Sequence, residues 1–260
     1  MQNQKLVLFD FDGVIVDGMQ EYWFSSSLAC REYLISKELP LTLKNNLPVS
    51  NTFRYIRPWV KYGWEMVLIT HEILKKNNPL DEFNKNLFVN NYHQNCLNIL
   101  TRNSWNHQTV QKSLDDARKH QMDLNFDNWM NLHLPFNKVI SFIKKANDNG
   151  LKIGIISTKG RIFTQKILHK LDIFPELIFG YECGTKLEII TNLSCSYRII
   201  GFIEDRRKTL MNIINNDKTR HIPCFLANWG YLKESDKLNL PKELKVLKLN
   251  DLEDILAVSK

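Results

Sequence analysis

The sequence predicts an α/β fold in which a doubly wound parallel sheet is interrupted by a block of helices. The first observation is an apolar run, Leu6–Phe9, that lacks helical spacing and therefore indicates a buried parallel strand. The second is an alternation of strand and helix patterns from Pro135 onward, which is typical of a doubly wound sheet. The third is the stretch 18–134, which shows helical spacing and no convincing strand pattern. The first strand must therefore join a sheet whose other strands lie more than 100 residues further along the chain.

Apolar side chains recur at helical spacing in four stretches of the middle block, Met19–Ser36, Phe53–Lys76, Asp81–Leu100 and Thr109–His120. We expect Pro58 and Gly63 to break the second stretch. Asp81 and Thr109 are the expected N-caps, because their side-chain oxygens can accept hydrogen bonds from the first turn of a helix.

The elements expected after Pro135 alternate in type. Asn137 is the expected N-cap of a helix that Gly150 stops. Strands are predicted at Ile153–Ile156, Leu177–Phe179, Ile199–Ile203, Phe225–Ala227 and Val246–Leu249. Helices are predicted at Ile162–Leu171, from Thr185 onward, at Leu210–Ile214 and at Leu252–Leu256.

Composition narrows the class of protein. A hydrophobic fraction of 43% and a charged fraction of 24% are ordinary for a globular chain. No apolar stretch is long enough for a membrane span and the N-terminus lacks a signal-peptide profile, so we expect a soluble, cytoplasmic protein with no membrane partner. The net charge is +7, but the lysines are spread along the chain, which favours a solvated surface over a nucleic-acid partner. The five cysteines are scattered without a CxxC pair, which predicts reduced thiols and no zinc site.

The most informative motif is the string Asp10-Phe11-Asp12-Gly13-Val14-Ile15-Val16-Asp17, directly after the first strand. Ligands of open α/β sheets bind beyond the carboxyl ends of the strands, where Asp10 and Asp12 would lie. Asp12-Gly13 alone is typical of an ordinary turn. The full string resembles the first motif of the haloacid dehalogenase superfamily, Asp-x-Asp-Gly-(Val/Thr)-apolar-x-Asp, at every specified position.

Three further fragments resemble the remaining motifs of that superfamily, in order and at predicted strand or helix ends. Ser157, followed by Thr158, matches the hydroxyl residue of the second motif, although Ser-Thr before a helix also suits an N-cap. Lys186, after a Gly-Thr turn, looks like the lysine of the third motif. Glu204-Asp205 resembles the fourth motif, with Asp205 in the place of its metal-binding acid.

The resemblance implies a core of residues 1–17 and 135–260 with the superfamily's Rossmann-like fold, and a helical cap of residues 18–134, as in the capped phosphoglycolate phosphatase and β-phosphoglucomutase-like group. It implies a Mg²⁺-dependent phosphatase acting on a small phosphorylated metabolite, with Asp10 as nucleophile and Asp12 as general acid and base. Ser157, Thr158 and Lys186 would bind the phosphoryl group. Asp10, the backbone carbonyl of Asp12, Asp205 and Glu204 would hold the metal.

Two departures from the fourth motif keep alternatives open. Glu204 replaces the usual glycine and Thr209 takes the place of a second aspartate, so the ligand set is not fixed by the sequence. A phosphomutase of the β-phosphoglucomutase type would use the same four motifs. A non-catalytic relative could keep the fold as a binding module. The sequence does not indicate the substrate or the oligomeric state.

Overall fold

The computed structural model describes residues 4–34 and 48–253, and the chain divides into two compact units. One unit holds the residues up to Asp17 together with those from Leu134 onward, and the other holds Gly18–His133. We call them the core unit and the helical unit. Within the described ranges, no helix combines the length and apolar character needed to cross a membrane.

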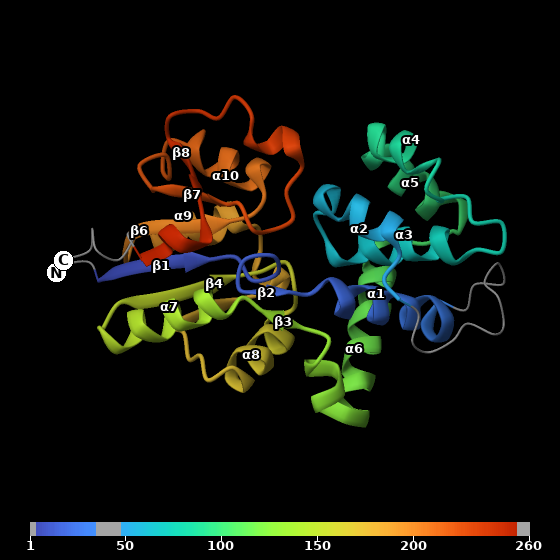
Figure 1. The fold of residues 1–260 in the computed structure, drawn as a ribbon, viewed down its shortest axis with the longest axis horizontal. Coiled ribbons are helices and arrows are strands. Elements are labelled where there is room, and N and C mark those ends of the chain that lie inside the picture. The colour runs from blue at the N-terminus through green and yellow to red at the C-terminus, as the bar shows by residue number, and fades with distance from the viewer. Residues whose placement is uncertain (1–3, 35–47, 254–260) are drawn as a thin grey trace. The chain divides into compact units, whose positions relative to one another are not determined.

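The core unit contains a six-stranded sheet with the order β5-β4-β1-β6-β7-β8, all neighbours being parallel (Figure 1). The strands are β1 (Lys5–Phe9), β4 (Lys152–Ile156), β5 (Leu177–Phe179), β6 (Arg198–Glu204), β7 (Cys224–Ala227) and β8 (Leu244–Leu247). The first strand of the chain thus lies in the middle of the sheet, beside two strands that begin more than 100 residues later. Phe9 pairs with Ile155 on one side and Ile203 on the other, so the ends of these three strands meet at one edge.

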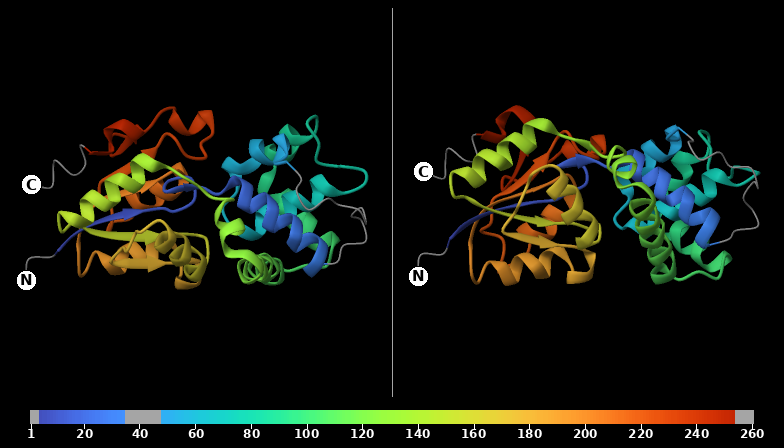
Figure 2. Two further views of the ribbon diagram at one scale, coloured as in Figure 1. Left: turned by 60° about the horizontal axis from the view of Figure 1, so that its bottom comes forward. Right: turned by 90° about the horizontal axis from the view of Figure 1, so that it is seen from below.

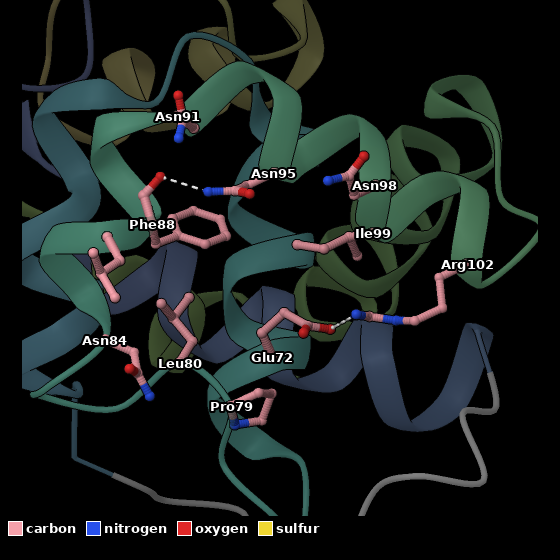
Figure 3. Close-up of a pocket in the computed structure, with 11 residues that line it drawn as sticks. Glu72, Pro79, Leu80, Asn84, Phe88, Asn91, Asn95, Asn98, Ile99 and Arg102 are labelled. Carbon is pink, nitrogen blue, oxygen red and sulfur yellow. Dashed lines mark hydrogen bonds and ion pairs between the residues drawn. The ribbon is translucent and has the colours of Figure 1, made fainter.

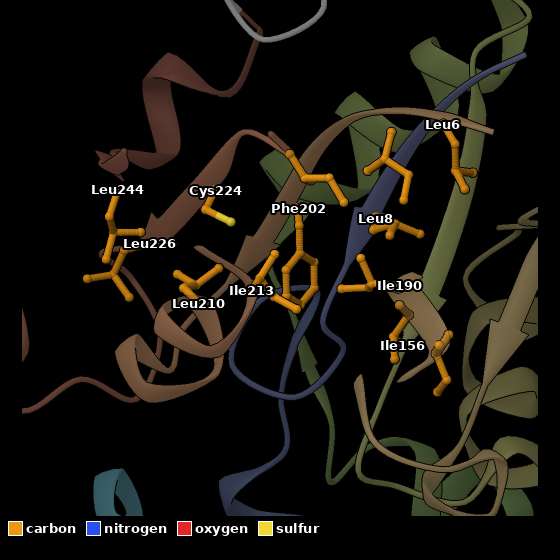
Figure 4. Close-up of a cluster of buried hydrophobic side chains, with 13 residues drawn as sticks. Leu6, Leu8, Ile156, Ile190, Phe202, Leu210, Ile213, Cys224, Leu226 and Leu244 are labelled. Carbon is orange, nitrogen blue, oxygen red and sulfur yellow. The ribbon is translucent and has the colours of Figure 1, made fainter. Parts of the chain in front are cut away.

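Helices cover both faces of this sheet (Figures 1 and 2), as expected for a doubly wound fold. The helices are α7 (Asn137–Asp148), α8 (Arg161–Lys170), α9 (Lys186–Leu193) and α10 (Arg207–Ile214). Leu8 and Phe202 of the sheet belong to one buried cluster with residues of α9 and α10 (Figure 4). Phe9 instead contacts Phe142 of α7 edge to face, with ring centroids 6.1 Å apart. Successive residues of β1 thus serve opposite faces, which explains its continuous apolar run.

Several expected boundaries in the core unit are wrong. Helix α10 begins at Arg207 rather than at Leu210. The last strand is Leu244–Leu247 rather than Val246–Leu249, and Leu249 opens a 3₁₀ turn that ends at Asp251. Asn137 is the first residue of α7, with Phe136 at the N-cap, because the chain is still extended at Phe136. The expected helix Leu252–Leu256 lies mostly outside the described residues. The helix expected from Thr185 onward begins at Lys186, with Thr185 as its N-cap in a capping box with Glu188.

Two short segments join the core unit to the rest of the chain. β2 (Val16–Asp17) and β3 (Leu134–Pro135) pair as an antiparallel ribbon where the chain leaves the core unit and where it returns. Strands of two residues are too short to produce an alternation pattern, so the sequence does not predict this ribbon.

The described part of the helical unit contains only helices and turns. Its α-helices are α1 (Met19–Leu28), α2 (Asn51–Ile56), α3 (Gly63–Leu74), α4 (Lys85–Asn90), α5 (Tyr92–Arg102) and α6 (His107–Met130), and Ala29–Tyr33 continues α1 as a π-helical turn. The predicted break at Pro58 and Gly63 is confirmed, because α2 ends before the 3₁₀ turn Arg57–Trp59 and α3 begins at Gly63. Part of the expected helix Met19–Ser36 lies outside the described residues.

Two other helix predictions in this unit are wrong. The stretch expected as one helix from Asp81 to Leu100 is two helices, because Asn91 leaves the helical region with φ −124° and ψ 39°. Helix α6 is capped by Asn106, whose side chain accepts a hydrogen bond from the backbone N–H of Thr109 at 2.8 Å. It continues beyond His120 to Met130, with a kink at Asn125, where φ is −160° and ψ is 96°.

A buried ion pair and a pocket characterise the helical unit. Arg118 of α6 donates to Glu21 of α1 at 2.8 Å, with both side chains fully buried, and this pair links the two helices. A pocket of about 340 Å³ lies among α3, α4 and α5 (Figure 3). At this pocket the Oε1 atom of Glu72 lies 2.7 Å from Arg102 and 2.9 Å from Lys75.

The five cysteines form no disulfide in the structure. Cys30, Cys96 and Cys224 are buried, whereas Cys183 and Cys195 are exposed.

Candidate active site

Asp10 occupies the end of the central strand, where the sequence predicts a site. Its backbone N–H donates to the carbonyl of Ile203 at 2.8 Å, which extends the pairing with β6 by one residue. Its side chain is buried against Lys186, the first residue of α9. The Nζ atom of Lys186 lies 2.5 Å from Asp10 Oδ1 and 2.6 Å from Glu204 Oε2. One ammonium group therefore bridges two carboxylates from neighbouring strand ends.

Glu204 and Asp205 complete a cluster of three buried acids. Glu204 ends β6 with no exposed surface, and its Oε1 accepts the backbone N–H of Arg206 at 3.1 Å. Asp205 follows it, and its Oδ2 accepts the backbone N–H of Tyr231 at 2.7 Å. Asp10, Glu204 and Asp205 each offer an oxygen within 4.8 Å of the others. Carboxylate oxygens gathered in this way fit a hard divalent cation such as Mg²⁺.

The electrostatics of this cluster agree with that fit. Burial, together with the nearby charge of Glu204, raises the pKa of Asp10 to about 7, against the opposing effect of Lys186. Burial also raises the pKa of Glu204. Burial lowers the pKa of Lys186, but the two carboxylates outweigh it and the pKa is raised overall, so this side chain stays charged. The cluster therefore holds more negative charge than one lysine offsets at alkaline pH.

Asp12 forms an ion pair with a different lysine, Lys159. Its side chain is buried, and Oδ1 lies 3.3 Å from the Nζ atom of Lys159. Lys159 has no exposed surface, and it occupies the turn between β4 and α8. Its backbone N–H donates to the Oγ atom of Ser157 at 2.9 Å, so the predicted hydroxyl residue lies in the same turn. Thr158 between them is half-buried.

Two parts of this region were not among the predicted site residues. Lys159 is the first. The feature of the sequence that could have indicated it is its position two residues after Ser157, at the end of a predicted strand. The second is the loop after β7, where Tyr231 contacts Asp205. A Cβ atom added at Gly230 would lie 2.3 Å from the Cβ atom of Asp205, and one added at Gly13 would lie 2.1 Å from Asp205 Oδ2. Glycine is thus required at both positions for the two loops to approach Asp205.

The parallel sheet, the central Asp-x-Asp strand end and the acid cluster define a hydrolase of the haloacid dehalogenase type. Residues 4–189 match the sequence model of the family of haloacid dehalogenase-like hydrolases, and the chain belongs to this family. No curated protein matches the chain significantly.

Solved structures show the same fold at low sequence identity. A predicted phosphatase from Clostridium acetobutylicum is 15% identical, with a TM-score of 0.59, over 99% of this chain and 100% of its own. A predicted phosphoglycolate phosphatase from Haemophilus somnus 129pt is 13% identical, with a TM-score of 0.59, over the whole of both chains. A haloacid dehalogenase-like family hydrolase from Streptococcus pneumoniae is 15% identical, with a TM-score of 0.55, over 99% of each chain.

Proposed function

We propose that this protein is a Mg²⁺-dependent phosphatase that hydrolyses a small phosphorylated metabolite through an aspartyl-phosphate on Asp10. The observation that carries the proposal is the contact of Lys186 with both Asp10 and Glu204, beside Asp205. This arrangement combines a carboxylate nucleophile, a fixed cation and a metal-binding cluster at the carboxyl edge of the sheet.

In the first step an oxygen of the Asp10 carboxylate attacks phosphorus, and the bond between phosphorus and the ester oxygen breaks. The electron pair of that bond stays on the leaving oxygen, which takes a proton from the carboxyl group of Asp12. The ammonium of Lys186 remains protonated and offsets the charge of Asp10 and of the phosphoryl oxygens. The hydroxyl of Ser157 and the neighbouring Thr158 would donate hydrogen bonds to those oxygens.

In the second step Asp12, now a carboxylate, takes a proton from water. The water oxygen attacks phosphorus, and the bond to Asp10 breaks with its electron pair returning to the carboxylate. Inorganic phosphate leaves, and both aspartates regain their starting states.

The residues that would hold Mg²⁺ are Asp10, Asp205, Glu204 and the backbone carbonyl of Asp12. When bound, Mg²⁺ would supply positive charge that reduces the repulsion between these carboxylates and the phosphate ester. Glu204 uses both of its oxygens on Lys186 and on the backbone N–H of Arg206, so it also fixes the lysine.

The class of substrate is supported by the family and by the likeness to the Haemophilus somnus protein, a predicted phosphoglycolate phosphatase. A small phosphorylated metabolite is the common feature, and a cytoplasmic location would suit such a substrate.

The experiment measures phosphate release from an aryl phosphate and from a panel of metabolite monophosphates, with and without Mg²⁺. We expect Mg²⁺-dependent release by the wild type and a loss of at least about 1,000-fold in Asp10→Asn, because the nucleophile is removed. Asp172→Asn is the matched control, since this exposed aspartate lies in the same unit and outside the site. Isomerisation of a sugar phosphate without phosphate release would contradict the proposal, as would an inactive, folded wild type.

A further inference from the structure

We propose that Lys159 is a positioning residue, which holds the carboxyl group of Asp12 in the orientation needed for proton transfer to the leaving oxygen. This inference rests on the proposed function and deepens it. Lys159 is a buried charged side chain. It is not the nucleophile, and it belongs neither to the proposed phosphate contacts nor to the metal-binding cluster.

The burial of Lys159 is the first observation. Its side chain has no exposed surface, although lysine is rarely buried completely unless it is paired. Removing an ammonium group from water is unfavourable, and only close compensation makes such a site tolerable. The Asp12 side chain, whose Oδ1 atom lies 3.3 Å away and which is almost fully buried itself, is the charge partner of this ammonium when it is ionised and a polar contact for it when it carries the proton. The side chains of Lys159 and Asp12 therefore hold each other in position.

The backbone around Lys159 is the second observation. Lys159 lies two residues beyond Ser157, and its N–H donates to the Ser157 hydroxyl oxygen at 2.9 Å. The same turn therefore fixes both the hydroxyl proposed to bind the phosphoryl group and the ammonium that pairs with Asp12. Because β4 pairs directly with β1, this turn lies beside the end of the strand that Asp10 and Asp12 follow.

The chemistry of this contact is specific to one part of the reaction. Asp12 delivers its proton to the leaving oxygen while phosphorus forms its bond to Asp10. The ammonium of Lys159 lies 3.3 Å from Oδ1 of Asp12 and keeps its own protons, so it acts on the position of the carboxyl group only. An aryl oxide leaves readily without protonation, whereas an alkoxide requires the proton. Displacing Asp12 should therefore slow the hydrolysis of alkyl phosphates far more than that of aryl phosphates.

The test compares one alkyl phosphate with one aryl phosphate, under saturating Mg²⁺, in wild type, Lys159→Met and Lys159→Arg. For Lys159→Met we expect the ratio of alkyl to aryl kcat to fall by about 10- to 100-fold, because misplacement of a catalytic group by about 1 Å can cost as much as 100-fold. Lys159→Arg keeps the charge but shifts its position, so the ratio should fall by less. Lys218→Met, on an exposed loop, should leave both rates unchanged.

A double substitution tests whether Lys159 acts through Asp12. In an Asp12→Asn background, Lys159→Met should cause no further fall in the alkyl-to-aryl ratio. If Lys159→Met does not fold, the same ratio of alkyl to aryl kcat is measured for Lys159→Arg, alone and in the Asp12→Asn background. It should fall in the single variant and should not fall further in the double variant. Equal losses on both esters in the folded variants would overturn this inference while leaving the proposed function intact. A wild type that hydrolyses neither ester would overturn the proposed function and this inference with it.

Discussion

Replacing Asp10 by asparagine should stabilise the metal-free protein, and increasingly so as the pH rises. Asp10 is a buried carboxyl group whose pKa is raised from 3.8 to about 7, mainly by burial and then by Glu204. The folded state therefore binds this proton more tightly than the unfolded state between pH 4 and 7. The free energy of unfolding must fall as the pH rises through that range, and the full penalty remains above pH 7. The side chain of asparagine does not ionise in this range, so Asp10→Asn does not lose this part of the free energy of unfolding.

The magnitude follows from the pKa difference. Each pKa unit corresponds to about 1.4 kcal/mol, so the penalty at alkaline pH is on the order of 4 kcal/mol. Part of this gain is offset in Asp10→Asn, because Lys186 loses one of its two carboxylates. The change between two pH values avoids this offset. Between pH 5 and pH 8 the stability advantage of the variant should grow by about 2 to 3 kcal/mol.

The assay is urea denaturation in the presence of EDTA at pH 5 and pH 8, with Asp172→Asn as the exposed control. The control should show no comparable growth, because its carboxylate is largely solvated in the folded protein. An advantage of Asp10→Asn that stays constant or shrinks between the two pH values would refute this reasoning.

Three further substitutions probe the surroundings of the site and the helical unit. Gly13→Ala should cost about 2 kcal/mol of stability or more and abolish phosphate release, because φ is +90° and the new Cβ would lie 2.1 Å from Asp205 Oδ2. Tyr231→Phe removes the hydrogen bond from the phenol to Asp17 Oδ1, at 2.5 Å, and should lower stability by about 1 kcal/mol in thermal denaturation without changing activation by Mg²⁺. Glu72→Gln should lower stability at pH 7 by about 1 to 2 kcal/mol, allowing for its partly exposed partners. Burial raises the pKa of Glu72, but hydrogen bonds outweigh it and lower that pKa from 4.5 to about 2, so this contribution is present above pH 4.5 and is lost toward pH 2.

Each of these substitutions has a matched control. Gly150→Ala places a side chain at φ +77° with open space around it, so it separates backbone strain from close approach to the site. Tyr197→Phe makes the same chemical change as Tyr231→Phe at another position of the core unit, and Glu243→Gln makes the same change as Glu72→Gln at an exposed position outside the helical unit. A Gly13→Ala variant no worse than Gly150→Ala would count against the close approach. Loss of Mg²⁺ activation in Tyr231→Phe would count against the prediction for that variant. A pH-independent effect of Glu72→Gln would count against the prediction for Glu72.

The sequence predicts the architecture well because the relevant patterns are local and strong. The apolar run before Asp10 indicates a buried strand, and parallel pairing brings the end of this strand beside the ends of β4 and β6. The capping box at Thr185 likewise fixes the start of α9, and with it the position of Lys186. The contact of Lys186 with Asp10 is a consequence of these placements, although the reaction itself stays a proposal.

Other features depend on distant contacts that no local pattern encodes. The pairing of Lys159 with Asp12 joins residues separated by more than 140 positions, and lysines in a turn are ordinarily solvated. Tyr231 contacts Asp205 through its backbone, for which side-chain identity gives no signal. The break at Asn91 between α4 and α5 is also hidden, because the apolar spacing continues across it. The ribbon of β2 and β3 is too short for any periodicity.

The central claim is that Asp10 receives the phosphoryl group, and acid quenching of a single turnover tests it directly. The substrate is an aryl phosphate with a radiolabelled phosphoryl group, and the proteins are wild type, Asp12→Asn and Asp10→Asn. An aryl ester needs no proton for the first step, whereas the second step needs Asp12 as a base, so label should accumulate on Asp12→Asn. We predict a hydroxylamine-sensitive label on the peptide containing Asp10 and none on Asp10→Asn. Turnover without covalent label, or label that persists in Asp10→Asn, would contradict the account.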